Sequence, residues 1–536
     1  MEIARPHRAV RKGTSWAAFI ALTMTLGIAS AQAQVVQGTL ELQWGDPHPA
    51  QRAQQGVFTA TIITDAGIRV PLEPEQARRA AGDLYALANR RVAVEFSAQQ
   101  KSSPLRQAAV IVSAEKTVAR AAPVNNGGRV MAAAPVSGNT RWVTLMCRFS
   151  DIATEQKDKV FFQSQYGTGA GELGHYWKEV SYGKIDLAGS AAYGWFVLPQ
   201  PREFYITKNG DKDKANLDQL FKDCGAAADA EVNFTGVLGV NMMFNGNLDG
   251  FAWGGGGCAT LEGVNMCKKT TWNPPWAFNN LAPLAHEMGH AYGLPHSDNS
   301  DGDDDTYDNP WDVMSDGWRN ATSSTTFGAL PKHINIYQRE RLGWVDAARK
   351  QSIAGNNDTR VRINLDFASL AGSTNKQMVV LAMPQGGDPY QSTIYTLEAR
   401  NRTGTYESKL AGDAVIIHAL QNYGNAKSMD MDVPAANVAN NEGSMFKVGE
   451  TWTSPDQNQT HWVQVEEATA TGFVVSVGPK PRVTGGNQRA RLQSAASAGQ
   501  QAPSSAAPLQ QVTSPVAPQR RARMPATVRQ VRMQEQ

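Results

Sequence analysis

The sequence predicts an α+β protein whose 536 residues are divided among several domains. Short runs of alternating apolar and polar residues occupy both flanks of the chain, whereas helix and strand patterns are mixed in its centre. The chain has 41% hydrophobic residues, 48 Gly and 27 Pro, which is typical of a globular protein rich in strands and turns. This composition excludes a coiled coil, a collagen and a wholly disordered chain.

Residues 1–33 have the pattern of a secretory signal peptide. A basic stretch that ends at Lys12 precedes an apolar run from Trp16 to Ile28, and Ala31-Gln32-Ala33 has the small residues of a cleavage site. The apolar run is shorter than the roughly 20 residues that a bilayer core requires, so an uncleaved anchor is the weaker alternative. We expect a secreted or periplasmic protein without a transmembrane segment.

The cysteines are expected to form disulfides in such an oxidising compartment. The four are Cys147, Cys224, Cys258 and Cys267. Of the three pairings we favour Cys258–Cys267 with Cys147–Cys224, because it keeps the short loop local. A cysteine zinc site is the alternative, but the chain has no Cys-x-x-Cys pair.

Residues 34–120 are expected to form a β-rich N-terminal domain. Strand patterns at 57–63 and 91–96 enclose a helical stretch from Glu73 to Leu87. A linker rich in Ala, Pro, Gly, Asn and Ser follows at 121–137.

The central domain is expected at 138–346, with strands at 142–146 and 237–244 and a helix at 171–180. Beyond it the chain returns to strand patterns. They lie at 378–381, 414–417 and 472–477, and they indicate an antiparallel β-sandwich over 347–479.

The charge is distributed unevenly. The formal net charge of +2 combines +3 in residues 1–33 and +8 in residues 480–536 with −9 in the body between them. An acidic body argues against a general nucleic-acid binder. The basic tail, 480–536, has no aromatic residue to bury or to stack on bases, so we expect a disordered extension or a segment removed on maturation, and no nucleic-acid partner.

The most informative segment is H-E-M-G-H-A-Y-G-L-P-H, at residues 286–296. Positions i and i+4 share one face of a helix, so His286 and His290 can direct two imidazoles at one metal ion. Gly293 can adopt the left-handed conformation that ends a helix, which would let His296 return as a third ligand. A surface helix that is merely rich in histidine is the alternative.

Three neutral imidazoles leave one corner of a tetrahedral zinc site open to water, which is the arrangement of a catalytic site. Nitrogen ligands do not exclude another transition metal, but zinc is the default. Zinc would lower the pKa of the bound water, and Glu287 is expected to act as the general base that accepts its proton and returns it to the leaving amine. The segment therefore predicts a zinc endopeptidase that hydrolyses proteins or peptides.

The same residues resemble the zinc motif of the metzincin endopeptidases. In that clan a methionine-bearing turn lies beneath the metal, and Trp311-Asp312-Val313-Met314-Ser315 follows His296 at a suitable distance. The resemblance implies that Met314 is an apolar floor of the site and not a ligand, whereas ordinary core packing is the alternative. Some metzincins place a tyrosine two residues after this methionine, but this chain has Asp316 there, so no such role is carried over.

Three further segments resemble the secreted immune-inhibitor-A-like and gametolysin-like peptidases. They are YWKEVSYGK at 176–184, RLGW at 341–344 and YTLEAR at 395–400, so that the resemblance covers residues 140–479. Immune-inhibitor-A-like enzymes commonly carry an acidic residue where this chain has His296. A histidine at this position makes the motif more similar to that of the gametolysins. The resemblance implies a zincin-type catalytic domain, which the β-rich regions predicted from strand patterns at 34–120 and 347–479 would flank.

An acidic loop lies between the third histidine and Met314. Its six aspartates are Asp298, Asp301, Asp303, Asp304, Asp305 and Asp308. Carboxylates at this density repel one another unless they are solvated or bind a hard cation, and the spacing is not that of an EF-hand. A structural calcium site and a solvated loop are both left open.

The N-terminal domain is either a propeptide that blocks the cleft or a permanent accessory domain. Residues 34–146 contain no cysteine, so latency through a cysteine on the metal is excluded. The glycines at 254–257 are expected to let a substrate or partner backbone approach closely. His175, His333 and His418 are expected to be structural.

Two other functions stay open beside the endopeptidase. One is a non-catalytic secreted surface or adhesion protein with a structural metal, and the other is a zinc hydrolase of a non-peptide amide. An open corner on the metal beside Glu287 argues against the first, because a structural zinc normally has four protein ligands.

Overall fold

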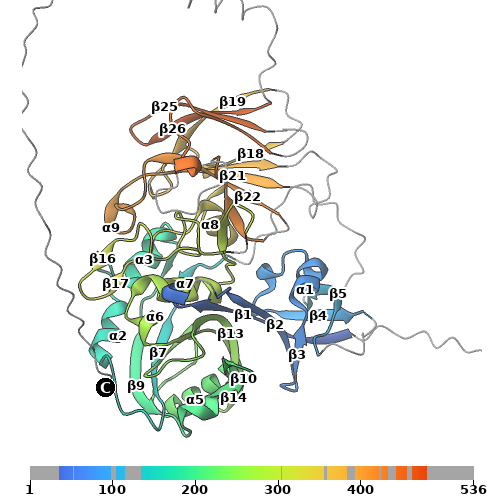
Figure 1. Cartoon of the computed structure of the whole chain (residues 1–536), viewed down its shortest axis with the longest axis vertical. Coiled ribbons are helices and arrows are strands. Elements are labelled where there is room, and N and C mark those ends of the chain that lie inside the picture. The colour runs from blue at the N-terminus through green and yellow to red at the C-terminus, as the bar shows by residue number, and fades with distance from the viewer. Residues whose placement is uncertain are drawn as a thin grey trace, which may run out of the picture. The chain divides into compact units, whose positions relative to one another are not determined.

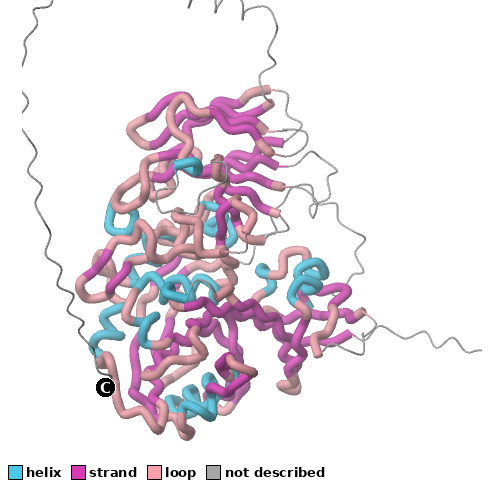
Figure 2. The backbone as a smooth tube through the Cα atoms, in the orientation of Figure 1, coloured by secondary structure: helices cyan, strands magenta, loops and turns pink. Residues whose placement is uncertain are grey.

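The computed structural model describes residues 35–479, apart from 52–53, 98–103, 115–134, 304, 355–358, 383–392, 422–423, 432–441 and 456–460. The expected signal peptide, most of the linker, the basic tail and Asp304 lie outside the described residues. Residues up to Lys480 belong to one unit. Helices and strands are mixed and several sheets are present, as predicted for an α+β protein (Figures 1 and 2).

The largest sheet has ten strands and includes both N-terminal and central segments of the chain. Its order is β3-β2-β1-β13-β14-β12-β7-β9, with β4 paired to β1 and β5 paired to β4. The strands are β1 (Val35–Pro47), β2 (Val57–Thr64), β3 (Arg69–Leu72), β4 (Arg91–Phe96), β5 (Ala108–Ser113), β7 (Trp142–Arg148), β9 (Ala191–Val197), β12 (Gly239–Phe244), β13 (Phe251–Leu261) and β14 (Val264–Asn273). The expected strands at 57–63, 91–96, 142–146 and 237–244 all lie in this sheet.

Strand β1 joins the two parts of the sheet. Its first residues, from Val35 to Thr39, pair with β4, and the stretch from Gly38 to Gly45 pairs with β2. Its last residues, from Gln43 to Pro47, pair antiparallel with β13. In Figure 1 it runs from the N-terminal strands to a position beside β13 and helix α7 (Leu281–Ala291). Glycines permit this packing: a Cβ on Gly255 would lie 2.0 Å from the carbonyl oxygen of Leu42, and one on Gly254 would lie 2.3 Å from that of Glu287. The backbones that approach this glycine run thus come from the chain itself.

The helices of the described residues are short. They are α1 (Pro74–Ala81), α2 (Lys159–Gln165), α3 (Leu173–Val180), α4 (Arg202–Tyr205), α5 (Leu217–Ala228), α6 (Pro275–Phe278), α7 (Leu281–Ala291), α8 (Ile336–Arg341) and α9 (Gly404–Glu407). The single helix expected from Glu73 to Leu87 was wrong. Helix α1 ends before Gly82, where φ is +72°, and a separate 3-10 turn follows at Tyr85–Leu87.

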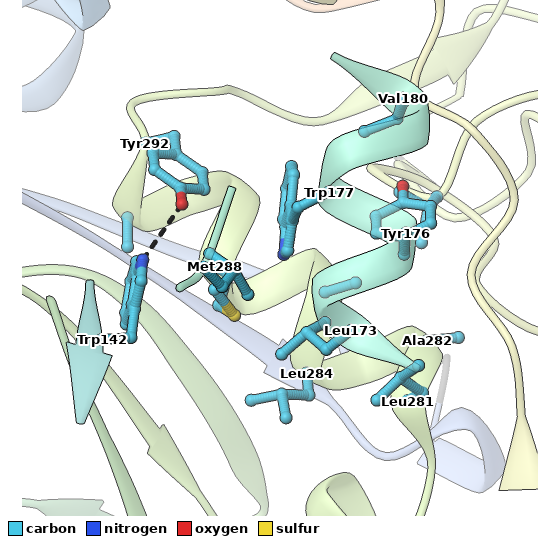
Figure 3. Close-up of a cluster of buried hydrophobic side chains, with 14 of the residues drawn as sticks. Trp142, Leu173, Tyr176, Trp177, Val180, Leu281, Ala282, Leu284, Met288 and Tyr292 are labelled. Atoms are coloured by element: carbon cyan, nitrogen blue, oxygen red, sulfur yellow. Dashed lines mark hydrogen bonds between the residues drawn. The ribbon is translucent and has the colours of Figure 1, made fainter. Parts of the chain in front are cut away.

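Helix α7 is buried over its whole length. One side packs with α3 in an apolar cluster that includes Trp177, Leu284 and Met288 (Figure 3). At the C-terminal end of α7 the indole Nε1 of Trp142 donates to the hydroxyl of Tyr292, 3.0 Å away. This packing fixes the helix so that its histidines face the opposite way, toward β1.

Two further sheets form the C-terminal sandwich. A six-stranded sheet has the order β15-β23-β22-β21-β20-β18 and a four-stranded sheet has the order β19-β26-β25-β24. The strands are β15 (Ser297–Asn299), β18 (Lys350–Ala354), β19 (Val361–Asp366), β20 (Met378–Ala382), β21 (Ile394–Arg400), β22 (Ala414–Leu420), β23 (Ala426–Ser428), β24 (Thr451–Thr453), β25 (Trp462–Ala468) and β26 (Gly472–Gly478). One core contains side chains of both sheets, among them Leu365, Val379 and Val475.

The sandwich is not wholly antiparallel, which corrects the expectation. Strands β18 and β20 pair in parallel, and so do β15 and β23. Strand β15 follows His296 directly, so a segment expected in the central domain is an edge of the C-terminal sheet. The expected domain boundaries stay predictions.

Three small two-stranded sheets complete the fold of the described residues. They pair β6 (Gly138–Asn139) with β8 (Ile185–Asp186), β10 (Ile206–Asn209) with β11 (Lys212–Ala215), and β16 (Ser323–Ser324) with β17 (Gly328–Ala329). No helix in this part of the chain is long and apolar enough to cross a membrane.

The predicted disulfide pairing is confirmed. Cys147 on β7 bonds to Cys224 on α5, and Cys258 and Cys267 bond across the β13–β14 pair. Two disulfides are compatible with an extracellular protein. The signal peptide stays a prediction.

Candidate metal centre

Helix α7 and the turn after it bring three imidazoles together. His286 and His290 lie one helical turn apart, and Gly293, with φ of +94°, reverses the chain so that His296 returns to the same point. The Nε2 atom of His290 lies 3.0 Å from Nε2 of His286 and 3.1 Å from Nε2 of His296. The three predicted ligands therefore converge through the same ring nitrogen.

The outer ring nitrogens of the two helical histidines are held by backbone carbonyls. Nδ1 of His286 donates to the carbonyl of Val313 at 2.6 Å, and Nδ1 of His290 donates to that of Leu294 at 2.7 Å. With the proton on Nδ1, Nε2 of each ring presents a lone pair to the centre of the cluster. Two lone pairs that face each other at this distance favour a cation between them.

The fourth donor is a carboxylate that the sequence analysis did not identify. Asp46, near the end of β1, places Oδ1 2.6 Å from Nε2 of His296 and Oδ2 3.2 Å from Nε2 of His290. Nε2 of His286 lies 3.5 Å from Oδ1. The hydroxyl of Tyr307 donates to the same Oδ1 at 2.5 Å. The corner that was expected to be open to water is therefore filled by a protein side chain.

These four residues fit a divalent transition metal. Their donor atoms all lie within 4.8 Å of one another, and all four side chains are buried. Zinc–nitrogen bonds of about 2.0–2.1 Å place tetrahedral ligands roughly 3.3 Å apart, close to the observed nitrogen separations. The donor set fits a metal ion without fixing which metal it is.

Burial and the carboxylate of Asp46 determine which groups of the site are charged. Burial lowers the pKa of His290 to about 3, so this imidazole is neutral, as a ligand must be. Burial alone would raise the pKa of Asp46, but the three histidines outweigh it and hold that pKa well below the ordinary 3.8. Asp46 is therefore a carboxylate anion, and His290 presents a neutral imidazole to it.

Glu287 lies beside the ligands. Its side chain is 1% exposed, and burial together with the charge of Asp46 raises its pKa well above the ordinary value. Oε2 of Glu287 has no hydrogen-bond partner among the described residues. Glu287, Asp46 and His286 line one pocket, whose other walls include Trp276, Pro283 and Trp318. The carboxylate therefore borders a small open pocket.

Met314 is fully buried against α7. A Cβ on Gly289 would lie 2.3 Å from Sδ of Met314, so the absence of a side chain at Gly289 permits this contact. The carbonyl of Met314 accepts from the backbone N–H of Ser297 at 3.0 Å. The turn at Met314 thus packs behind the ligand-bearing helix and contacts the chain beside His296.

Only some of the aspartates of the acidic loop lie close to one another. Asp301, Asp303 and Asp308 form a second group whose carboxylate oxygens lie within 4.8 Å of one another. Asp298 pairs with Lys427 at 3.2 Å, and Asp305 accepts from the backbone N–H of Tyr307.

Within this group Asp308 is the buried member. It is 2% exposed, and its Oδ2 has no hydrogen-bond partner among the described residues. Burial and the charge of Asp298 raise the pKa of Asp308 to about 8. Its Oδ1 accepts from the backbone N–H of Asn299 at 2.9 Å, so Oδ2 is the carboxylate oxygen that is left without a donor.

The other singled-out histidines lie outside the metal centre. Nδ1 of His175 is 3.0 Å from the hydroxyl of Tyr406, His333 contacts Glu179 at 2.8 Å, and His418 is buried 4.0 Å from Glu398.

Two aromatic residues of the site were also missed. Trp44 stacks on the ring of His290, with centroids 4.8 Å apart and planes within 5°, and Tyr307 lies against His296. Trp44 and Asp46 sit in an ordinary strand pattern with no motif of their own, so no local signal marks them. No protein-family model, curated protein or solved structure matches this chain.

Proposed function

We propose that the protein is a secreted zinc endopeptidase of metzincin type. The observation that carries the proposal is the buried, unpartnered oxygen of Glu287 beside three converging imidazoles. A structural metal site has no use for a carboxylate in this position, whereas hydrolysis requires a base beside the metal.

In this proposal His286, His290 and His296 hold the metal. Bound zinc would polarise the substrate carbonyl and lower the pKa of a water molecule. Glu287 takes the proton from the attacking water and transfers it to the leaving amine. Val313 and Leu294 orient the ligands through their carbonyls, and Met314 packs behind the helix.

An extended peptide is the substrate that the surroundings favour. Strand β13 lies next to the metal and accepts an antiparallel strand along its edge, from Phe251 to Gly255. Binding through the backbone is how sheet edges recognise extended peptides. Trp276 and Trp318 give the pocket beside the histidines apolar walls, which an apolar substrate side chain would contact.

One observation supports a structural metal, and another argues against it. Asp46 supplies the fourth protein ligand that a structural zinc normally has. However, such a site does not explain why Glu287 lines a pocket with Oε2 buried and without a hydrogen bond. Catalysis explains the position of Glu287, and it is compatible with Asp46 if the Asp46 carboxylate can move away from the metal site.

We also propose calcium as the ion of the acidic loop, held by Asp301, Asp303 and Asp308. The support is the uncompensated Oδ2 of Asp308, since hard cations prefer carboxylate oxygens.

The test is casein cleavage by the chain from residue 34, with and without Asp46→Ala, each paired with Glu287→Ala at matched zinc content. We expect cleavage by at least one form that retains Glu287, and a loss of at least about 100-fold when Glu287 is replaced. Stoichiometric zinc without cleavage by either form would contradict the proposal and favour a structural metal.

A further inference from the structure

We propose that Arg400 is a positioning residue of the metal centre, through which the C-terminal sandwich holds the turn that orients His286. The inference rests on the proposed function, because it concerns the same metal site. It gives a role to YTLEAR at 395–400, a segment that the proposed reaction does not use. The sandwich is then a part of the metal centre and not a separate binding domain.

The orientation of His286 depends on the turn that contains Met314. Nδ1 of His286 donates to the carbonyl of Val313 at 2.6 Å, and a bond of this kind fixes the tautomer and the direction of a ligand ring. The carboxylate of Asp312 accepts from the backbone N–H of Met314 at 2.8 Å and from the side-chain amide of Asn335 at 2.6 Å. The carbonyl that orients the ligand therefore belongs to a turn that is itself held by hydrogen bonds.

This turn begins inside the core of the C-terminal region. Trp311 is fully buried in an apolar cluster with four residues of that region, Leu410, Ala414, Ile416 and Met445. The indole Nε1 of Trp311 donates to the hydroxyl of Ser444 at 2.9 Å. A side chain two positions before Val313 is therefore anchored outside the central part of the chain.

Arg400, the last residue of β21, holds the backbone of the same tryptophan. Its Nη1 donates to the carbonyl of Trp311 at 2.8 Å and to Oε1 of Glu398 at 3.3 Å, and its Nη2 bonds to Glu407. The three charged side chains are at most 1% exposed. A planar guanidinium can bond to three acceptors in fixed directions, whereas the compact ammonium of a lysine cannot reproduce this geometry.

The fold alone does not explain why these charges are buried. Each buried ion loses its hydration, and apolar residues of similar volume often stabilise a protein as well or better. The carboxylates of Glu398 and Glu407 place the Arg400 cation so that it donates to the carbonyl of Trp311. The cluster therefore fixes the start of the turn that orients His286.

A second ligand is connected to the same sheet. Strand β15 follows His296 directly and pairs in parallel with β23, in the six-stranded sheet that also contains β21. Ser297 of β15 donates to the carbonyl of Met314 at 3.0 Å. Two of the three histidines are therefore positioned by segments that the sandwich holds.

The experiment compares metal binding by the chain from residue 34 and by its Arg400→Lys variant. Competition with a chelator measures the zinc affinity, and the visible absorption of the cobalt(II) form reports the ligand geometry. Urea unfolding of the metal-free proteins measures stability separately. We expect Arg400→Lys to bind zinc about tenfold more weakly and to change the cobalt spectrum, because losing the group that orients a ligand typically costs about 10–100-fold in metal affinity.

Arg341→Lys is the matched control. Arg341 is also buried in an ion pair, since it bonds to Asp83 and to Tyr337, and no bond joins it to the turn in the described part of the chain. This variant should lose stability but keep the zinc affinity and the cobalt spectrum of the wild type.

Ser444→Ala covers the case in which Arg400→Lys does not fold. It removes the acceptor of the Trp311 indole and leaves the buried charges in place. We expect it to weaken zinc binding by roughly twofold to fivefold, on the scale of one ordinary hydrogen bond.

Two results would overturn the inference while leaving the proposed function intact. One is a zinc affinity and a cobalt spectrum that stay those of the wild type in both Arg400→Lys and Ser444→Ala. The other is an equal loss of zinc affinity in Arg341→Lys, because stability alone would then account for the effect. Stoichiometric zinc without peptide cleavage by any form would instead overturn the proposed function, whatever the zinc affinities.

Discussion

At the scale of single residues, β1 carries two buried carboxylates with opposite behaviour. Asp46 faces histidines, which lower its pKa, whereas burial raises the pKa of Glu41 to about 7 despite its ion pair with Arg69. Position along a strand therefore says little about the ionisation of a side chain, because the facing groups decide it.

Glu41 should make the free energy of unfolding depend on pH. Between its ordinary pKa of 4.5 and the folded value of about 7, the native state holds a proton that the unfolded chain has released. Stability should therefore fall as pH rises through this range, by on the order of 1–3 kcal/mol. Urea unfolding at pH 5 and pH 7.5 would measure it. Glu41→Gln should flatten the dependence, whereas the exposed Asp65→Asn should not, and identical slopes would refute the assignment.

The buried pair of Asp83 and Arg341 offers a second residue-scale prediction. Asp83→Ala leaves the guanidinium of Arg341 buried beside Tyr337 without its carboxylate. The expected cost is about 3–5 kcal/mol in unfolding free energy. The surface pair of Arg91 and Asp65 is the control, and its Asp65→Ala variant should lose far less stability, because solvent screens an exposed pair. Equal losses in denaturant unfolding would show that the buried pair has no special role.

At the scale of elements, the segment from β15 to the turn at Met314 connects the metal centre to the C-terminal sandwich. Strand β15 pairs with β23, and Asp298 bonds to Lys427 of that strand. Ser297, at the start of β15, donates to the carbonyl of Met314. An ion in the acidic loop would therefore stabilise a segment that begins next to His296.

Calcium should raise the melting temperature of the zinc-loaded protein. A concentration 100-fold above the dissociation constant would add about 2.7 kcal/mol, a rise of several degrees. Asp308→Asn should abolish most of this rise, whereas the exposed Asp211→Asn should leave it unchanged. Calorimetry with calcium and with magnesium would measure the effect. No shift with calcium in the parent protein would favour the solvated loop.

At the scale of the whole molecule, the two disulfides close loops of very different length. Cys147 and Cys224 are 77 residues apart, whereas Cys258 and Cys267 are separated by 9. In the chain-entropy description, replacing the first pair by alanine costs about 4–5 kcal/mol and replacing the second costs about 2–3 kcal/mol. Denaturant unfolding of the two double variants would measure this order. The reverse order would show that strain or residual structure in the unfolded chain dominates.

The local features of the chain were predictable from its sequence. The α+β class, most strands and the short Cys258–Cys267 loop followed from periodicity and spacing, which act over a few residues, and Cys147–Cys224 was then the remaining pair. The convergence of His286, His290 and His296 followed from one helical turn and Gly293, because a helix fixes the direction of residues four positions apart. Helix α1 was predicted too long, because Gly82 adopts a positive φ and stops it.

Contacts between distant segments were decided by the tertiary structure alone. Asp46 and His296 are 250 residues apart, and no spacing rule relates them. Their contact depends on β1 pairing with β13, which the sequence left unassigned because a strand pattern does not specify its partner. The sequence thus determined which histidines could bind a metal. The fold decided which carboxylate closes the site, since sheet pairing is set by the packing of the entire molecule.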